Sequence, residues 1–300
     1  MKLKGILTAS LALTALVFPT PAYAEGRSPI AENIEISTYR GIAVDGNLKA
    51  VDPDGDTLSF QITTPPIKGE VTLADNGSFV YSPDPSRRGK DYFGYTATDT
   101  NGNVSQEATV IITLCKQKTD VTYLDLTDSP IHYDAIRLAE EDIFVGQQLG
   151  GAYIFSPDTM ISRGEFLSMC VQISQLSLPT AVSSTGFSDD AHIPPWQKPY
   201  IAAALMNGSL SYTTETGNST FDSTAPITCA QAAVLVDRIF GISAASAASL
   251  PITSPDWAAQ SVANLIACDI LPKNCDTAQY INRSMTADML SAVMDVLENR

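Results

Sequence analysis

Two short turns of the sequence carry side chains that suit the binding of a hard cation. Their oxygen-bearing residues alternate along the chain, and they are Asp52, Asp54 and Asp56 in one turn and Asp99, Asn101 and Asn103 in the other. Ca²⁺ takes several carboxylate and amide oxygens in a flexible geometry, which such a turn around a glycine supplies. The pattern therefore predicts a calcium site. The alternative is a turn without a ligand, because Asp-Pro-Asp-Gly is itself a favoured turn sequence.

The elements that position these turns lie between about residues 30 and 114, where apolar and polar residues alternate between turn signals. The alternation predicts seven strands, at 34–38, 46–51, 57–63, 69–73, 78–82, 92–99 and 105–114. Short strands in this number are typical of an immunoglobulin-like β-sandwich. In that fold both acidic turns lie at one end of the sandwich, where the first strand also begins. We therefore expect Glu32 to join them in the calcium site.

The same segment resembles the cadherin-like, immunoglobulin-like repeats of bacterial surface proteins. The residues that carry the resemblance lie at 50–60, 69–71, 76–83, 89–95 and 98–103. The resemblance implies a domain displayed at the cell surface, with a protein partner as its candidate ligand.

From about residue 121 to residue 300 the apolar residues follow helical spacing, and one pattern recurs. Three pentapeptides, at 161–165, 227–231 and 285–289, each open an apolar helix. The first two carry Ser or Thr followed three residues later by Glu or Gln, which predicts a capping box. The third, opened by Thr286, lacks the reciprocal residue. Each pentapeptide follows another helical pattern, at 134–140, 196–206 and 257–266, so the repeating unit is helix, variable loop, helix.

These repeats resemble the S-layer homology modules that hold bacterial proteins on the cell wall. The residues that carry the resemblance are 123–126, 135–136, 155–157 and 161–165 in the first repeat, 186–189, 195–196, 199–204, 221–222 and 227–228 in the second, and 256–258, 281–283 and 285–286 in the third. The resemblance implies an all-α unit in which three modules pack around a pseudo-threefold axis. The modules would span 121–180, 184–244 and 250–300, and a linker at 115–120 would join them to the sandwich.

The resemblance also implies a ligand, because grooves between modules of this family bind an anionic secondary cell-wall polysaccharide. Peptidoglycan is the alternative wall polymer. The family places Arg or Lys just inside the capped helix, where free amides, the helix dipole and a guanidinium suit an anion. Arg163 keeps this residue, whereas the second repeat has Cys229 and the third has Ala287 with Arg283 nearby. The implied polysaccharide-binding residues are Arg163, Asp125, Asp189, Trp196, Trp257 and Arg283. The alternative for the two tryptophans is packing in the core.

The overall charge limits the classes of partner. The chain has 300 residues, with 18 Lys and Arg against 33 Asp and Glu, and a net charge of −15. This charge disfavours nucleic acid and anionic membrane surfaces, and it requires a local basic group wherever an anion binds. The chain lacks the Gly-x-Ser-x-Gly, His-Glu-x-x-His, Walker A and Gly-x-Gly-x-x-Gly signatures and has only two histidines. We therefore expect no enzyme activity and no required cofactor, with Ca²⁺ as the one candidate.

Residues 1–24 are typical of a secretory signal peptide, with a basic start, an apolar run and an Ala-Tyr-Ala cleavage site. The alternative is an N-terminal membrane anchor, and no other stretch is long and apolar enough to span a bilayer. Export would place the protein in an oxidising compartment, where its cysteines can pair. Cys268 and Cys275 flank a short loop and are one candidate pair, and Cys170 and Cys229 are a second. The alternative is that all five cysteines are thiols.

The sequence thus predicts a multidomain, non-enzymatic protein on the wall of a bacterium. An N-terminal all-β immunoglobulin-like sandwich is followed by an all-α, three-module pseudo-trimer that anchors the chain without a covalent bond. The alternative is an adhesive or spacer protein whose modules are degenerate and act as scaffold or lattice contacts.

Overall fold

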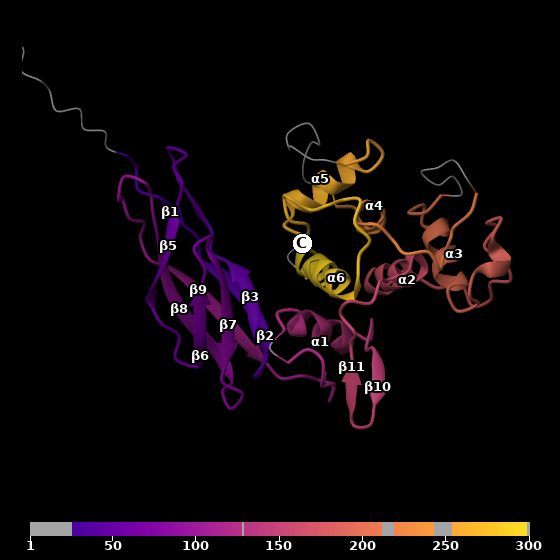
Figure 1. The fold of residues 1–300 in the computed structure, drawn as a ribbon, viewed down its shortest axis with the longest axis horizontal. Helices are drawn as coiled ribbons and strands as arrows, with labels where there is room; N and C mark the ends of the chain where they lie inside the picture. The colour runs from indigo at the N-terminus through magenta and orange to yellow at the C-terminus, as the bar shows by residue number, and fades with distance from the viewer. Residues whose placement is uncertain (1–25, 128, 212–218, 243–253, 299–300) are drawn as a thin grey trace, which may run out of the picture.

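The structure is a computed structural model that describes residues 26–127, 129–211, 219–242 and 254–298. The expected signal peptide at 1–24 lies outside these ranges. A strand-rich part and a helical part lie side by side, with α1 (His132–Glu140) next to the sandwich (Figure 1). Within the described ranges no helix has the length and apolar composition that a membrane span requires.

The strand-rich part is a sandwich of two sheets. Its strands are β1 (Ile30–Ala31), β2 (Ile34–Tyr39), β3 (Val44–Asn47), β4 (Ala50–Val51), β5 (Ser59–Thr64), β6 (Gly69–Leu73), β7 (Ser78–Pro83), β8 (Gly89–Thr98) and β9 (Ala108–Cys115). One sheet has the order β2-β9-β8-β5, and the other has the order β3-β7-β6. β2 runs parallel to β9 and the other neighbours are antiparallel, while β1 and β4 form a separate short pair.

Alternation along the strands explains the core between the sheets. In β9 every second residue is buried, and these residues are Ala108, Val110, Ile112 and Leu114. Phe79 of β7 meets Phe93 of β8 edge to face, with ring centroids 5.2 Å apart. All seven expected strands have counterparts. The expected strand 46–51 is divided between β3 and β4, because β3 pairs with β7 whereas β4 pairs with β1.

The helical part contains two helices per repeat. The first helices are α1, α3 (Lys198–Met206) and α5 (Ala259–Ala267), and the second are α2 (Arg163–Ile173), α4 (Cys229–Phe240) and α6 (Arg283–Glu298). A short 3₁₀ helix, η1 (Asp190–His192), precedes α3.

The expectation of an all-α unit is wrong in the first repeat, which also contains a hairpin of β10 (Gln147–Leu149) and β11 (Ala152–Ile154). Gly150 and Gly151 form its two-residue turn, and Gly150 has a φ of +64°. Two glycines at this position favour a tight hairpin over a helical connection.

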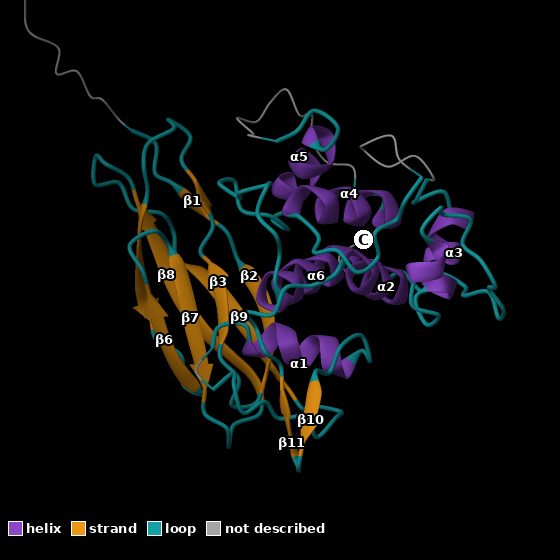
Figure 2. Ribbon diagram, turned by 45° about the vertical axis from the view of Figure 1, so that its right-hand side comes forward, coloured by secondary structure: helices purple, strands orange, loops and turns teal. Residues whose placement is uncertain are grey.

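Each first helix packs against the second helix of another repeat. α3 packs on α2, α5 packs on α4, and α1 closes the cycle by packing on α6. α2 also contacts both α4 and α6, so the second helices form the centre (Figure 2). The cores of the three repeats are therefore continuous, and one hydrophobic cluster runs through all of them.

A ring of backbone hydrogen bonds lies where the second helices begin. The Ile161 amide donates to the Ile281 carbonyl at 3.2 Å, and the Ile227 amide donates to the Ile161 carbonyl at 3.2 Å. The Ile281 amide completes the ring by donating to the Ile227 carbonyl at 3.0 Å. These three isoleucines are thus equivalent positions of the three repeats.

This ring of hydrogen bonds corrects the expected start of the second helix in the third repeat. α2 and α4 begin with the expected capping boxes at Ser162 and Thr228. α6, however, begins at Arg283, because the Asn282 Oδ1 atom caps the Met285 amide at 2.9 Å. Thr286 lies inside the helix and donates its hydroxyl to the Asn282 carbonyl. Arg283, not Ala287, is therefore the equivalent of Arg163.

Two of the contacts between the sandwich and the helical part are an aromatic pair and an ion pair. The ring of Tyr39 on β2 lies 5.7 Å from that of Tyr133 on α1. Lys49 Nζ lies 3.1 Å from an Asp269 carboxylate oxygen just after α5, and both side chains are largely exposed.

Candidate functional site

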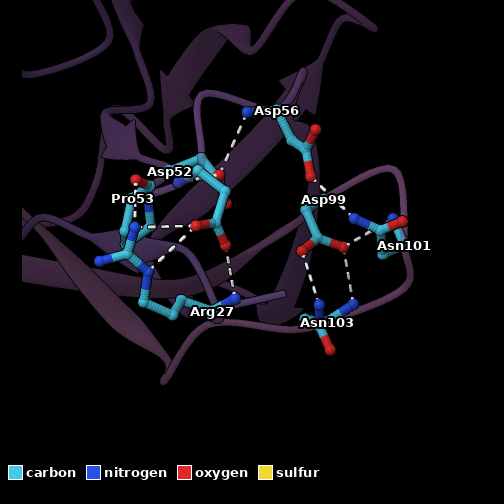
Figure 3. Close-up of polar contacts among 8 residues, drawn as sticks. Arg27, Asp52, Pro53, Asp56, Asp99, Asn101 and Asn103 are labelled. Carbon is cyan, nitrogen blue, oxygen red and sulfur yellow. Dashed lines mark hydrogen bonds and ion pairs between the residues drawn. The ribbon is translucent and has the colours of Figure 1, made fainter. Parts of the chain in front are cut away.

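The two acidic turns fold into the same local shape (Figure 3). In the first turn Asp52 Oδ1 accepts hydrogen bonds from the amides two and four residues later, at 2.8 and 3.1 Å. In the second turn Asp99 Oδ1 accepts the equivalent two bonds, both at 2.8 Å. Gly55 and Gly102 occupy the fourth position of their turns with φ of +82° and +86°, which glycine adopts without strain.

The two turns meet at the end of the sandwich, as expected from the sequence. Asn101 Nδ2 donates to Asp56 Oδ2 at 2.8 Å, and Asn103 Nδ2 donates to Asp99 Oδ2 at 2.8 Å. Burial by itself raises the pKa of Asp99, which is only 6% exposed, but the bonds from Asn103, Asn101 and Gly102 outweigh burial and lower it. Asp99 is therefore held as a carboxylate.

The segment before β1 covers both turns, which the sequence analysis missed. The Arg27 amide donates to Asp54 Oδ2 at 2.6 Å, and the Arg27 guanidinium lies 2.8 Å from Asp54 Oδ1. These bonds lower the pKa of Asp54, the amide bond most strongly. A Cβ atom on Gly26 would lie 2.8 Å from Asn103 Nδ2, so glycine permits the close approach. Opposite charges are the one signal for this contact, and pattern alone does not pair Arg27 with one particular aspartate.

The residues of the predicted calcium site are not all brought together, and calcium binding stays a prediction. Asp54 faces Arg27, and Glu32 is exposed, with its backbone carbonyl 2.5 Å from the Tyr95 hydroxyl and no described contact to either turn. Asp52 Oδ2 is buried without a hydrogen-bond partner, which is the state of a carboxylate oxygen that fits a cation. Among the described residues, no three His, Cys, Asp or Glu side chains are arranged to hold a metal, so a calcium site needs amide oxygens as well.

The helical part holds the second candidate site, at three equivalent contacts that we call joints. Each joint pairs the first residues of a second helix with a loop of the next repeat, cyclically. The first joint pairs α2 with 221–225, the second pairs α4 with 275–279, and the third pairs α6 with 155–159. At each joint the first two helix amides donate to loop carbonyls at 2.8–3.0 Å. The free amides expected for an anion at Arg163 are therefore occupied.

Arginine and an aromatic ring meet at two of the three joints. At the first joint the Arg163 guanidinium lies 5.3 Å from the centre of the Phe221 ring. At the third joint Arg283 Nη1 donates to the carbonyl of Phe155, the equivalent of Phe221, at 2.8 Å. The Arg283 guanidinium also lies 5.0 Å from the centre of the Phe144 ring. Arg163 is 8% exposed, while Arg283 is half-buried.

Asp125 lies in the first repeat and Asp189 in the second. Each carboxylate accepts hydrogen bonds from backbone amides of its own repeat. The Asp125 carboxylate accepts the amides of Phe155 and Ser156 at 3.0 and 2.7 Å. The Asp189 carboxylate accepts the two equivalent amides of the second repeat, both at 2.9 Å. These bonds hold the joint loops against the start of each repeat. Both aspartates thus position the joints, and their oxygens are turned to the protein backbone.

The two tryptophans are on the surface, so the alternative of core packing is wrong. Trp196 is 53% exposed and Trp257 is 42% exposed. Trp196 precedes Gln197, whose amide lies so close to Gly164 that a Cβ there would meet it at 2.1 Å. Gln197 thus packs against the start of α2, while the Trp196 ring lies 6.4 Å from the ring of Tyr200.

The cysteines do not form the expected pairs in this structure, where all five are free thiols. Cys170 is fully buried, and burial raises the pKa of its thiol. Cys229 instead lies next to Cys275, and the two neighbouring thiols raise the pKa of Cys229 and lower the pKa of Cys275. The packing of each second helix against the next repeat explains this contact. It places the loop with Cys275, from the third repeat, against the start of α4 in the second repeat.

Residues 27–115 match the bacterial cadherin-like domain family. The match confirms the resemblance of the sandwich segment and covers no residue of the helical part. The chain is also similar to the surface-layer 125 kDa protein of Lysinibacillus sphaericus, with 29% identity over 156 residues. That alignment covers 48% of this chain and 13% of the relative. The chain therefore spans a small part of the length of this curated relative.

Two solved structures are each similar to about a third of the chain. The endo-fucoidan hydrolase MfFcnA4 of glycoside hydrolase family 107 is 20% identical, with a TM-score of 0.26 and coverage of 31% of this chain and 14% of that chain. The SrpA adhesin R347E mutant of Streptococcus sanguinis is 18% identical, with a TM-score of 0.24 and coverage of 33% and 66%. Scores this low support no argument about function.

Proposed function

We propose that this chain is a non-enzymatic cell-surface protein of a bacterium, held on the cell wall by its helical repeats. The repeats would act as S-layer homology modules that bind an anionic secondary wall polysaccharide, and the cadherin-like sandwich would face outward. The similarity to a surface-layer protein and the cadherin-like match support a place at the cell surface.

The observation that carries the wall-binding proposal is the recurrence of arginine at equivalent joints. Arg163 and Arg283 occupy the first position of α2 and α6, each against the loop of another repeat. In a chain of net charge −15, two buried or half-buried guanidiniums at equivalent places are the local basic groups that an anion requires. The exposed Trp196, which precedes Gln197 in sequence, offers a surface for a sugar ring.

The mechanism is multivalent docking. Two weak sites held in one rigid ring raise the effective concentration at the second site once the first is occupied. Because each contact joins an anion to a cation, binding should weaken as the salt concentration rises.

Co-sedimentation with purified cell walls tests this function. The full chain would be mixed with walls of Lysinibacillus sphaericus, either with their secondary polymer or with the polymer chemically stripped. We expect binding to unstripped walls, weakened about tenfold by Arg163→Ala or Arg283→Ala and further by the double variant. Arg163→Lys keeps the charge without the planar fork and should bind at an intermediate level.

Arg238→Ala is the matched control, because Arg238 is exposed in the last turn of α4, at the opposite end of that helix from the joint residue Cys229. Its binding should equal that of the unmodified chain, and circular dichroism should show that every variant is folded. Equal binding to both wall preparations would assign the ligand to peptidoglycan. Binding to neither would favour the alternative, in which the repeats serve as scaffold or lattice contacts and the sandwich is the adhesive part.

We also propose that the two acidic turns bind Ca²⁺, supported by the buried, unpartnered Asp52 Oδ2 atom. Asp52 and Asp56 would supply carboxylate oxygens, and rotation of the Asn101 amide would turn its oxygen inward. A ligand at about 100 times its Kd stabilises the native state by about 2.7 kcal/mol, so the melting temperature of the sandwich should rise with added CaCl₂ and fall with EGTA.

Asp52→Asn should abolish this rise in melting temperature, because it removes the charge beside the unpartnered Oδ2 position. The control Asp75→Asn changes an exposed aspartate in another turn and should keep it. An unchanged melting temperature with CaCl₂ in the unmodified chain would show that the turns are closed by Arg27 and the asparagine amides alone.

A further inference from the structure

The second joint differs from the other two in both residues that face each other. At the first joint Arg163, the first residue of α2, meets Phe221, and at the third joint Arg283, the first residue of α6, meets Phe155. Each phenylalanine lies two residues before the first loop carbonyl that accepts a bond at its joint. Cys229 occupies the arginine position of the second joint, and Cys275 occupies the phenylalanine position.

The backbone bonds establish this equivalence without reference to side chains. The Cys229 amide donates to the Gln279 carbonyl at 2.8 Å, as the Arg163 amide donates to the Ala225 carbonyl at 2.9 Å. The next amide, of Ala230, donates to the Thr277 carbonyl at 2.9 Å. Cys275 lies two residues before Thr277, as Phe221 lies two residues before its own loop carbonyl.

We propose that Cys229 and Cys275 form an oxidisable pair that closes into a disulfide across the second joint, in place of the arginine–aromatic pairs of the other two joints. The two cysteines occupy the positions whose side chains meet at the first joint, and the backbone on both sides is fixed by the joint. The disulfide ties the second repeat to the third, and it removes the second joint from the set of anion sites.

The environments of the two thiols set the order of the reaction. Cys229 is 1% exposed, while Cys275 is half-buried and therefore the sulfur that an oxidant reaches. The neighbouring Cys229 thiol lowers the pKa of Cys275, which favours its thiolate. The oxidant is a small or protein disulfide, of which oxidised glutathione is the simplest.

The exchange is balanced in two steps. The Cys275 thiolate attacks one sulfur of the oxidant, its disulfide breaks, and one oxidant thiolate leaves. The Cys229 thiol then loses its proton, its sulfur attacks Cys275, and the second oxidant thiolate leaves. Two protons and two electrons pass from the cysteine pair to the oxidant, which is reduced to two thiols.

Peptide mapping of the full chain tests the proposal directly. The reduced, purified chain would be incubated with oxidised glutathione, alkylated, and digested with trypsin without reductant. Cleavage after Lys273 separates Cys268 from Cys275, so the peptide 274–283 carries Cys275 alone and reports its partner. We expect it linked to the peptide 164–238, which carries Cys170 and Cys229, and two of the five thiols should be lost.

Two variants identify the partner within that peptide. Cys170→Ala should leave the cross-link intact, whereas Cys229→Ser should release 274–283 as a free peptide. Oxidation should also raise the urea midpoint of the unmodified chain and leave that of Cys229→Ser unchanged. A link from 274–283 to the Cys268 peptide, a cross-link that survives in Cys229→Ser, or five free thiols after oxidation would each overturn the proposal. None of these results depends on wall binding, so the two proposals fail independently.

Discussion

Replacing Asp91 with alanine is expected to lower the free energy of unfolding of the sandwich by about 3 kcal/mol. Asp91 on β8 is fully buried, and its carboxylate accepts the Tyr81 hydroxyl at 2.7 Å. It also accepts the amides of Ile67 and Lys68 at 3.1 and 2.8 Å, which ties the loop between β5 and β6 to the opposite part of the sandwich. Alanine leaves these donors without an acceptor and opens a cavity.

The same carboxylate makes the sandwich sensitive to acid. Burial by itself raises the pKa of Asp91, but the bonds from Tyr81, Ile67 and Lys68 outweigh it and hold the pKa below its ordinary 3.8. The native state therefore binds fewer protons than the unfolded state near this pH. The stabilisation is fully present above about pH 4 and is lost as the pH falls through the folded pKa. In Asp91→Asn this loss between neutral and acidic pH should be smaller.

Hydrogen exchange of the segment 67–73, measured by mass spectrometry in urea, reports this prediction. Tryptophan fluorescence is unsuitable, because Trp196 and Trp257 both lie in the helical repeats. Asp75→Ala, at an exposed turn, is the control and should change stability by about 0.5 kcal/mol or less. Similar losses for Asp75→Ala and Asp91→Ala would contradict the role assigned to the buried carboxylate.

The second large effect is expected from Arg137→Ala, which should cost the helical part about 2–4 kcal/mol. Arg137 on α1 is 6% exposed and reaches α6, with Nη1 2.6 Å from Asp295 and 3.1 Å from the Ser291 carbonyl. Nη2 lies 2.9 Å from Glu298. This one side chain carries much of the polar contact between the first and the last helix of the ring.

Urea unfolding followed by tryptophan fluorescence measures the loss, since both indoles lie in the other two repeats. Their response to a change on α1 would show that the three repeats unfold together. Glu298→Ala is the informative control, because the Glu298 side chain is 72% exposed and its ion pair is screened by water. We expect a loss below about 1 kcal/mol there. A large loss in Glu298→Ala with a small one in Arg137→Ala would reverse the assignment.

The strands were predictable from sequence because a half-buried strand imposes a period of two on its residues. β9 shows this period over its full length, and its expected and observed ranges nearly coincide. β1 and β4 contain two residues each, too few to show any period, and their pairing depends on chain segments far apart in sequence. Local pattern therefore predicted the sheets and missed the short pair that closes one end.

Local pattern also misplaced the start of α6, the second helix of the third repeat. Thr286 precedes an apolar run and is a good capping residue on its own, so the helix was expected to begin there. The hydrogen-bond ring instead requires an extended Ile281, and the helix can begin as soon as that residue has paired. The signal that was available is the shared pattern of Ile, a polar cap and Arg at 161–163 and 281–283.

For the candidate sites, residue types were predictable and partners were not. The convergence of the acidic turns followed from the sandwich fold, but the covering Arg27 lies 27 residues from its aspartate. The expected cysteine pairs used closeness in sequence and equivalence of helices. The actual neighbours, Cys229 and Cys275, are brought together because each second helix begins against a loop of the next repeat. The pattern within a single repeat does not predict this packing between repeats.

The cyclic packing of helices between repeats has a consequence for how such a protein can gain or lose a repeat. An open array of repeats can lose or gain a unit at either end, because its end units already face water on one side. Here the packing of α1 on α6 leaves no end unit, so deleting one repeat would expose two apolar faces at once. We expect natural variants to keep or duplicate the whole triplet. The same closure should allow a circular permutant, in which the chain begins at another repeat and the old ends are linked.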